Sequence, residues 1–209
     1  AFTFKNEEKG FKDAETTITG ATDILIERLS EDLSLRQFVR DSYTSRGFLK
    51  TLKAEKSKPN SKYQNYFDYE EKVTSLMDPR SSHRYLAVRR GWIEEELSIS
   101  FGGSKQDDLL NHFHTAAASF GETMVSSVLE KAARIALKAH VVPSIENENH
   151  KNLKEVADQM AIQVFSENVR KVLLAVPYGP KGVLGVDPGI RTGCKIAVID
   201  GSGKYLADT

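Results

Sequence analysis

Apolar residues recur at helical spacing near the start of the chain. They fall three or four positions apart in residues 20–29 and again in residues 35–43, which predicts two consecutive helices. Ser30 is followed by two acidic residues, the pattern of an N-cap and a first turn that favours negative charge, so we expect the second helix to begin there. Gly47 is expected to follow the end of that helix.

The next stretch mixes helix, loop and strand patterns. The polar run 53–62 is expected to be a loop, and the aromatic run 63–69 a compact helix whose rings face the core. A short helix is expected over residues 83–90, with Gly91 at its end. Alternation of apolar residues with serine in residues 97–101 predicts a half-buried strand. This order of elements resembles a small helix-turn-helix module.

Alanine-rich helical tracts fill the middle of the chain. Apolar positions continue at helical spacing through residues 109–136 and again through residues 153–169. Pro143 is expected to break the pattern, and the polar residues 147–152 are expected to connect the two tracts. Helices of this composition can pack closely, so we expect a bundle or a spine.

The class of structure changes near residue 180. Short apolar strands are expected at residues 182–186 and 195–199, with a hairpin turn at residues 200–203 and a third strand from Tyr205. Residues 187–189, Asp-Pro-Gly, are expected to form a tight turn after the first of these strands. The pattern is typical of the start of an α/β sheet.

Together these patterns predict a mainly α chain that ends in the first strands of an α/β domain. We expect an N-terminal helical segment at residues 1–62 and a helix-turn-helix-like module with a short strand at residues 63–103. Long central helices are expected at residues 104–179, and the start of the α/β domain at residues 180–209.

The segment GVDPGIRTG, residues 185–193, holds the most informative candidate for chemistry. It places Asp187 at a strand end before a glycine turn, as both ribonuclease-H-like nucleases and actin-like ATPases begin. In a nuclease Asp187 would hold Mg²⁺, but two-metal hydrolysis needs several carboxylates around one site. In an ATPase the glycine turn would let backbone amides approach phosphate. Asp187 is also an ordinary turn former. One carboxylate is no two-metal site, so we expect these residues alone to be non-catalytic.

A cluster of basic side chains is the candidate for phosphate contact. Arg80, His83 and Arg84 lie about one turn apart, and Arg90 extends the same side of the expected helix. The acidic run 94–96 follows directly and could neutralise the cluster in intramolecular pairs. A nucleic-acid contact and an ordinary salt-bridged surface are therefore both open at this point.

Other conspicuous side chains are expected to be structural. His112 and His114 point in different directions on a helix and have no cysteine or acidic partner at ligand spacing, so neither a metal site nor a cofactor is expected. Tyr63, Tyr66 and Phe67 are expected to pack rather than stack on bases. Trp92 is expected to anchor a helix against a strand.

Composition narrows the class of partner. Lys and Arg together number 29, as do Asp and Glu, so no overall field attracts nucleic acid or an anionic membrane. Contact with nucleic acid would come from a local patch or from other parts of a longer protein. The single cysteine, Cys194, and the absence of any apolar run near ~18 residues lead us to expect a cytoplasmic protein. The start at Ala1 and the strand-like run 204–209 are what we expect of an internal piece.

Several motifs, in order along the chain, resemble those of Tex-type transcription accessory proteins. They are GATDILIE at 20–27, RQFVR at 36–40, YFDYE at 66–70, SHRYLA at 82–87 with RG at 90–91, and GVDPGIRTG at 185–193. The last is similar to the opening of the family's YqgF domain, a Holliday-resolvase-like ribonuclease H fold. Ser81 stands where the family usually has proline, and residues 1–19 match no family motif.

The resemblance implies a bacterial cytoplasmic protein that acts in transcription. The family adds helix-hairpin-helix elements and a C-terminal S1 domain, through which it binds RNA or DNA, and its YqgF domain generally lacks a full set of nuclease carboxylates. We therefore expect a non-catalytic, nucleic-acid-binding scaffold, with RNA polymerase as a candidate second partner and no membrane contact. The alternative is a metal-dependent nuclease in the full-length protein, with Asp187 as its first metal ligand.

Overall fold

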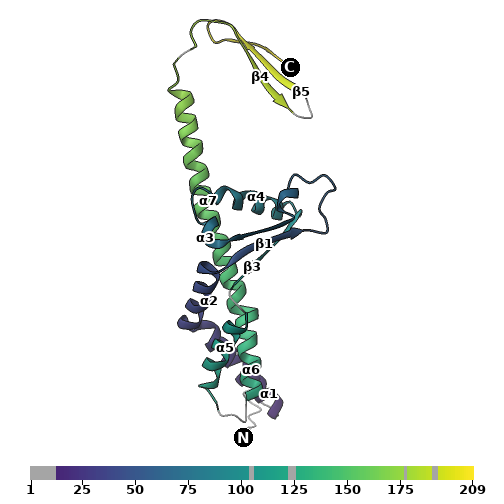
Figure 1. The fold of residues 1–209 in the computed structure, drawn as a ribbon, viewed down its shortest axis with the longest axis vertical. Helices are drawn as coiled ribbons and strands as arrows, with labels where there is room; N and C mark the ends of the chain where they lie inside the picture. The colour runs from purple at the N-terminus through teal and green to yellow at the C-terminus, as the bar shows by residue number, and fades with distance from the viewer. Residues whose placement is uncertain (1–12, 104–105, 122–125, 177, 190–192) are drawn as a thin grey trace. The chain divides into compact units, whose positions relative to one another are not determined.

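The chain is mainly helical, as the spacing of its apolar residues predicts. The computed structural model describes residues 13–103, 106–121, 126–176, 178–189 and 193–209 (Figure 1). The chain divides into two compact units, Ala1–Gln163 and Val164–Thr209, and each is described by itself. Within the described ranges, no helix combines the length and the apolar character that crossing a membrane requires.

Two helices open the N-terminal unit. α1 spans Ala14–Glu31 and α2 spans Leu33–Ser45, with Asp32 between them. The Asp32 carboxylate accepts hydrogen bonds of 2.8 and 2.9 Å from the backbone N–H groups of the second and third residues of α2, so Asp32 is the N-cap. The predicted cap, Ser30, is wrong by two positions because α1 continues past it. Gly47 follows the end of α2, as predicted.

A three-stranded antiparallel sheet follows the two helices. β1 (Phe48–Lys53) lies in the centre, between β2 (Asp68–Lys72) and β3 (Leu97–Gly102). Thr51 on β1 pairs with Tyr69 on one side and with Ile99 on the other. β3 confirms the predicted strand. β1 is not predicted, because its few apolar residues follow α2 directly and continue into the polar loop.

The aromatic helix expected over residues 63–69 is wrong. The segment makes one 3₁₀ turn, Gln64–Tyr66, and then enters β2. In β2 the side chains of Tyr69 and Glu71 are half-buried while their neighbours are exposed. This alternation with a period of two begins at the end of the aromatic run, whose helical spacing conceals it.

Two helices connect β2 to β3. α3 is a single turn, Val73–Leu76, and α4 spans Ser82–Ile93. Gly91, which was expected to end the helix, lies inside α4 and is buried. A Cβ atom at Gly91 would lie 2.6 Å from the Cδ1 atom of Leu97. Glycine therefore lets α4 approach β3 closely at this position.

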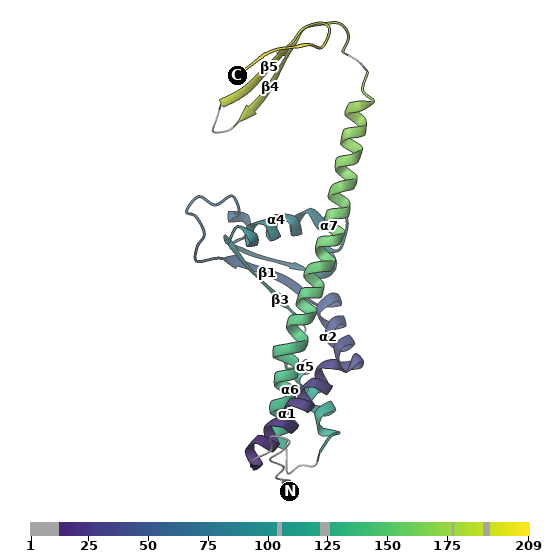
Figure 2. The same ribbon diagram turned by 180° about the vertical axis from the view of Figure 1, so that it is seen from behind.

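A continuous helical rod completes the unit and extends past its last residue, Gln163. α5 (Gln106–Ala118) precedes it. The rod consists of α6 (Ser126–Ile135), the π-helical segment η4 (Ala136–Val141) and α7 (Val142–Leu173). In both views α1 and α5 lie beside α6, the first part of the rod (Figures 1 and 2).

Pro143 does not break this rod, contrary to the prediction. Proline has no backbone N–H and normally disrupts a helix interior. Here the preceding turn is widened, because the N–H of Val142 bonds to the carbonyl of Leu137, five residues back. The widened turn ends directly before the missing donor, and α7 continues past it. Residues 147–152, expected to be a connection, lie in the interior of α7.

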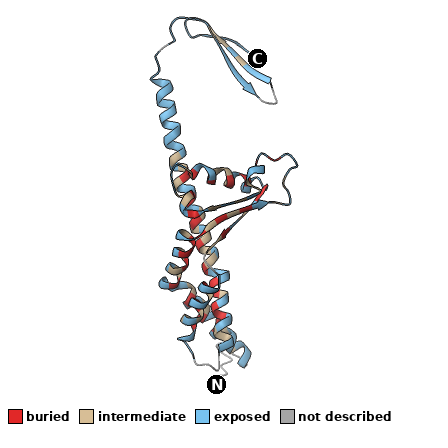
Figure 3. Ribbon diagram, viewed as in Figure 1, coloured by how far each residue is buried: buried red, intermediate tan, exposed pale blue. Residues whose placement is uncertain are grey.

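A row of buried residues four positions apart runs along the rod and into the core. Its members are Ala133, Leu137, Val141, Ile145, Asn149, Leu153 and Ala157. Figure 3 shows that buried residues of the N-terminal unit gather where this rod meets the helices and the sheet. The row explains why the rod stays attached over many turns.

α2 holds α7 through polar side chains one helical turn apart. The Arg40 guanidinium donates two hydrogen bonds to the Glu148 carboxylate, at 2.6 Å from Nε and 3.1 Å from Nη2. This contact raises the pKa of Arg40 above its usual value. One turn earlier, Nη2 of Arg36 donates to the Ser144 hydroxyl at 2.8 Å. The two arginines of the RQFVR segment therefore bridge two helices.

The C-terminal unit contains the end of α7 and a small antiparallel sheet. β4 (Val183–Gly189) pairs with β5 (Gly193–Ile199), which pairs with β6 (Tyr205–Asp208). The three strands predicted after residue 180 are confirmed.

The tight turn expected at residues 187–189 is wrong. Asp187 pairs with Lys195 and Gly189 with Gly193, so β4 continues through this segment. Residues 190–192, which complete the GVDPGIRTG motif, lie outside the described residues.

Loss of the Arg40–Glu148 contact should destabilise the N-terminal unit. The two side chains are 32% and 34% exposed, and the pair is bidentate. We expect Arg40→Ala and Glu148→Ala each to lower the free energy of unfolding by about 1 kcal/mol, with a coupling energy of about 0.5–1 kcal/mol in the double-mutant cycle. Urea denaturation of the four proteins measures this.

The control is the more exposed pair of Lys154 and Asp158, one turn apart on the same helix. Its cycle should give a coupling of only about 0.3 kcal/mol. An Arg40–Glu148 coupling no larger than this control would contradict a role for the pair in holding α7.

Candidate nucleic-acid interface

α4 carries the basic side chains that the sequence singles out. The helix buries every third residue from Ser82 to Gly91 and leaves its opposite side to solvent. Arg80, His83, Arg84 and Arg90 are all exposed. The cluster is therefore on the surface, but its members have different surroundings.

Arg84 is held apart from the other three. Its Nη1 atom donates to Oε1 of Glu71 at 2.7 Å, and the same oxygen accepts a hydrogen bond of 2.7 Å from the Ser75 hydroxyl. The Tyr69 hydroxyl also donates to Glu71. Because the Glu71 side chain is only 11% exposed, the pair is partly removed from water. Arg84 thus fixes α4 against β2.

Three basic residues remain for a ligand. His83 and Arg90 are two turns apart on α4, about 10 Å along its axis, so they share one exposed side. Arg80 lies in the turn before α4, where its backbone N–H donates to Oδ1 of Asp78 at 2.8 Å. We call Arg80, His83 and Arg90 the α4 basic face.

The acidic run at the end of α4 finds its partners in the loop after β1. The pairs are Lys56 with Glu95 at 2.7 Å, Lys62 with Glu94 at 2.9 Å and Lys58 with Glu96 at 3.8 Å. The pKa of Glu94 lies below its usual value, first because Lys62 donates a hydrogen bond and to a smaller extent because of the Arg90 charge. These ion pairs therefore do not involve the arginines of α4 directly.

His150 on α7 joins α4 to β3. Its Nδ1 atom lies 2.8 Å from the Tyr85 hydroxyl, which also donates to the His150 carbonyl at 3.0 Å. Trp92 stacks on the imidazole at 5.1 Å between ring centroids, and Phe101 meets it edge-on at 4.7 Å. Burial, aided by the Arg89 charge, lowers the pKa of His150 to about 4. Burial also raises the pKa of Tyr85 to about 12, so both groups are neutral near pH 7.

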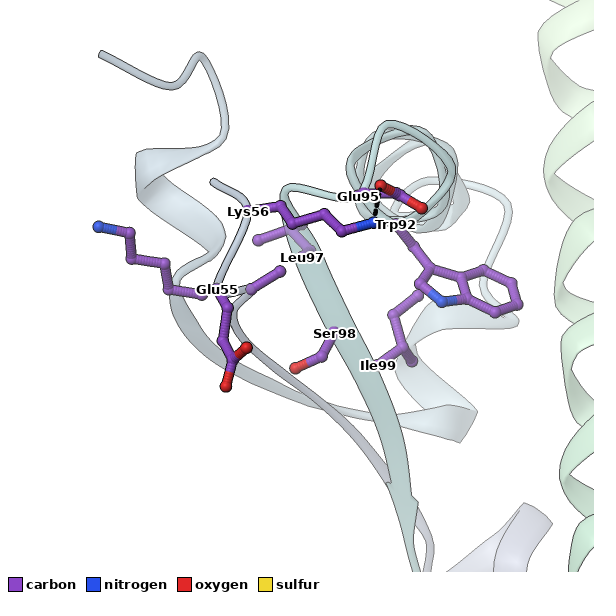
Figure 4. A pocket seen from close by; sticks show the side chains of 9 residues that line it. Glu55, Lys56, Trp92, Glu95, Leu97, Ser98 and Ile99 are labelled. Carbon is purple, nitrogen blue, oxygen red and sulfur yellow. Dashed lines mark hydrogen bonds and ion pairs between the residues drawn. The ribbon is translucent and has the colours of Figure 1, made fainter. Parts of the chain in front are cut away.

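Trp92 also lines a surface cleft of about 490 Å³ (Figure 4). The indole packs through one side on His150 and remains 43% exposed, so it is less buried than a packing anchor would be. The rest of the cleft comes from residues 53–56, from Glu95 and from residues 97–99 at the start of β3. Figure 4 shows Lys56 paired with Glu95 at the rim and Ile99 beside the indole.

The other residues considered for ligand binding have structural surroundings. Tyr63 is buried, and Tyr66 and Phe67 are half-buried. His112 stacks on Phe38 with 4.1 Å between ring centroids. In the part of the chain that the structure describes, no three His, Cys, Asp or Glu side chains come together in a way that could hold a metal ion.

Asp187 lies on β4 of the C-terminal unit and is exposed. Its cross-strand neighbour is Lys195, a cation rather than a second carboxylate. Two other carboxylates of this sheet have local partners. Asp200 accepts hydrogen bonds from the backbone N–H groups of Ser202 and Lys204 at 2.8 and 2.9 Å, and Asp208 accepts one from a tyrosine.

The lysine-rich loop and the exposed Trp92 are the features that sequence reasoning missed. Residues 50–62, the end of β1 and the loop after it, contain five lysines and one acidic residue, which is a visible signal of local positive charge. The loop becomes relevant only when folding brings it to Trp92 and to the acidic run 94–96, more than thirty positions away in the sequence.

Comparison with known proteins gives the chain a context. Residues 1–165 match a family described as Tex central region-like, and residues 181–209 match one described as the Tex protein YqgF-like domain.

Three relatives illustrate the similarity. Protein tex of Bordetella pertussis is 34% identical over 216 residues, 97% of this chain and 27% of the relative. Transcriptional accessory protein Tex of Neisseria gonorrhoeae is 35% identical over 199 residues, 93% and 26% respectively. S1 RNA-binding domain-containing protein 1 of Homo sapiens is 23% identical over 208 residues, 95% and 21%. The chain thus spans about a quarter of the length of these relatives.

The surroundings of His150 predict that acid destabilises the N-terminal unit. The folded state holds His150 neutral down to about pH 4, whereas the unfolded chain takes up the proton near pH 6.5. The unfolded state therefore binds more protons in this window, and stability should fall as the pH drops from 6.5 to 4. His150→Gln should flatten this dependence, while His140→Gln, at an exposed position, should leave it unchanged. Urea titrations at several pH values measure it, and equal slopes in wild type and His150→Gln would contradict it.

Proposed function

The chain belongs to the Tex family, and from that premise we propose that it is the scaffold part of a nucleic-acid-binding protein that acts in transcription. The names of its relatives, a transcriptional accessory protein and an S1 RNA-binding protein, support a nucleic-acid-related role. The helical rod supports the scaffold role, because α2 and α4 are both fastened to it by specific side-chain contacts. We propose that the chain itself catalyses nothing.

The contact that this chain makes with nucleic acid is proposed to be the α4 basic face. The observation that carries the proposal is that His83 and Arg90 share one exposed side of α4 while the acidic run 94–96 pairs elsewhere. The charge of Arg90 is therefore available to phosphate, and the exposed His83 imidazole offers a hydrogen-bonding group on the same side. Arg84 contributes by orienting α4 through Glu71 rather than by touching the ligand.

The affinity of this surface should be modest. The chain has no net charge, and a few exposed cations neutralise only a few phosphates. We propose that an S1 domain in the full-length protein supplies the tighter binding to RNA or DNA, that RNA polymerase is a second partner and that the protein works in the cytoplasm. Tight, sequence-independent binding by these residues alone would overturn this division of labour.

Removing charge from the α4 basic face should weaken binding and its salt dependence together. We expect Arg80→Ala with Arg90→Ala to lower the affinity for a mixed-sequence oligonucleotide several-fold, and to reduce the slope of log K against log salt concentration by about 2, one for each lost contact. Fluorescence anisotropy at several salt concentrations measures both.

The matched control removes two exposed arginines elsewhere in the same unit, Arg46 and Arg134. This variant carries the same change in net charge and should bind like the wild type. If both double variants lose affinity equally, binding follows net charge rather than the α4 basic face.

The alternative function is a metal-dependent nuclease of the full-length protein. It is supported by the position of Asp187, exposed on the first strand of the YqgF-like region. A second carboxylate would have to come from outside the described residues, because Lys195 is the neighbour across the strand.

Asp187→Asn in a polypeptide that carries the whole YqgF-like domain separates the two functions. We expect wild type and variant to be equally inactive on branched DNA, duplex DNA and RNA with Mg²⁺ or Mn²⁺. Asp200→Asn, in the turn before β6, is the control. Cleavage that Asp187→Asn abolishes and Asp200→Asn preserves would establish the nuclease and refute the non-catalytic scaffold.

A further inference from the structure

The cleft beside Trp92 combines an available aromatic ring with exposed cations. One side of the indole is stacked on His150 with an interplanar angle of 9°, and His150 is itself fixed by the Tyr85 hydroxyl. The ring is therefore oriented before any ligand arrives, yet 43% of Trp92 remains exposed. A half-exposed indole that is held from one side and lines a cleft offers a surface on which a planar ligand can stack.

The cations of the cleft are only loosely engaged. Lys56 pairs with Glu95, but the two side chains are 73% and 64% exposed, and such pairs contribute little to stability. The Lys53 ammonium lies 5.4 Å from the centre of the Phe67 ring, a contact that leaves its hydrogen-bond donors accessible. Both lysines can therefore turn to an anionic ligand at small cost.

We propose that this cleft binds one nucleotide of a single-stranded nucleic acid, with the base stacked on Trp92 and the flanking phosphates near Lys53 and Lys56. The proposal rests on the proposed nucleic-acid-binding function and adds a second surface to it. The cleft is open to solvent, and its volume of about 490 Å³ lies in the range of small-molecule sites, the size class of a single nucleotide. Bases in a duplex are already stacked and paired, so only a single strand can offer one to the indole.

This surface is separate from the α4 basic face. Trp92 follows Arg90 by two residues, which corresponds to about 200° around α4. The two surfaces therefore lie on opposite sides of the helix, and variants can address each independently.

The charges of the cleft set the strength and the tuning of binding. Lys53 and Lys56 are balanced by Glu55 and Glu95 in the same lining, so binding should be weak and dominated by stacking. Glu95 weakens phosphate binding in two ways. Its negative charge repels the phosphate, and its ion pair with Lys56 competes for the ammonium group. Its removal should therefore strengthen binding, an effect opposite in sign to removal of either lysine.

Trp92 provides its own assay, because it is the only tryptophan in the chain. We expect titration of the 209-residue chain with a short oligouridylate to quench its fluorescence saturably. Inorganic polyphosphate, which offers charge without bases, should leave the emission unchanged, and a duplex of the same length should have little effect. Absence of quenching by oligouridylate, or equal quenching by polyphosphate or duplex, overturns the proposal.

Variants test the assignment of roles. We expect Glu95→Gln to tighten binding about two- to threefold and Lys56→Gln to weaken it about two- to fivefold, as expected for exposed charges. Trp92→Ala should weaken binding of labelled oligouridylate by about fivefold or more in anisotropy, whereas Ile93→Ala, at an exposed neighbour outside the cleft, should not. Because Trp92→Ala also removes the His150 contact, Trp92→Phe provides a second test and should retain part of the affinity.

The outcomes separate this proposal from the α4 basic face. If Arg80→Ala with Arg90→Ala lowers the affinity measured by anisotropy while oligouridylate still quenches Trp92, the assignment of the cleft as a binding site is supported. Quenching that disappears with those variants, or that Glu95→Gln and Lys56→Gln leave unaltered, would show that the cleft is not the binding site.

Discussion

Continuation of the helical backbone from α6 through η4 into α7, past Pro143, is the constraint on which the rest of the N-terminal unit depends. Had the helix stopped at Pro143, as the residue type suggests, Glu148 and His150 would lie on a separate element. Instead one rigid helix presents Glu148 to α2 and His150 to α4. The sheet is fixed in turn, because Arg84 ties α4 to β2 and Gly91 allows α4 to approach β3.

The distribution of charge links this architecture to function. A chain with equal numbers of basic and acidic residues can still offer cations to a ligand if the acidic groups are engaged elsewhere. Here the loop lysines form ion pairs with the acidic run 94–96. Among the basic residues of the cluster, Glu71 forms an ion pair with Arg84. His83 and Arg90 are left on one side of α4, with Arg80 in the turn before it, and the exposed indole of Trp92 lies on the other side.

Sequence reasoning succeeded where one periodicity continues over many residues and failed where the period changes or where contacts are distant. The long apolar repeats of α1, α2 and α5 and the alternation in β3 were predictable from local pattern alone. β2 was not predictable, because its alternation begins at the end of an aromatic run that has helical spacing. The helix continues past Pro143 because the N–H of Val142 bonds to the carbonyl five residues back, and no residue type predicts such a turn.

The candidate site shows the same division. The arginines and the histidine in and before α4 were visible as a cluster. The sequence could not show that Glu71, on a neighbouring strand, would accept a hydrogen bond from Arg84 and not from the others. Exposure of Trp92 likewise depends on the placement of α7, whose His150 covers only one side of the indole. Such pairings follow from tertiary structure, and they decide which charges and rings remain available.

The row of buried residues on the helical rod has a geometric consequence for its neighbours. Residues four apart advance by about 40° around an α-helix at each step, so the row winds slowly around the rod. In η4 the hydrogen bond spans five residues, so one turn holds more than four residues and a step of four falls short of a full turn where α1 and α5 pack. Beyond it the row turns onward, past Ser144 and Glu148 at α2 and then past His150 at α4. The contacts with successive neighbouring elements therefore differ both in their position along the rod axis and in their angle around it.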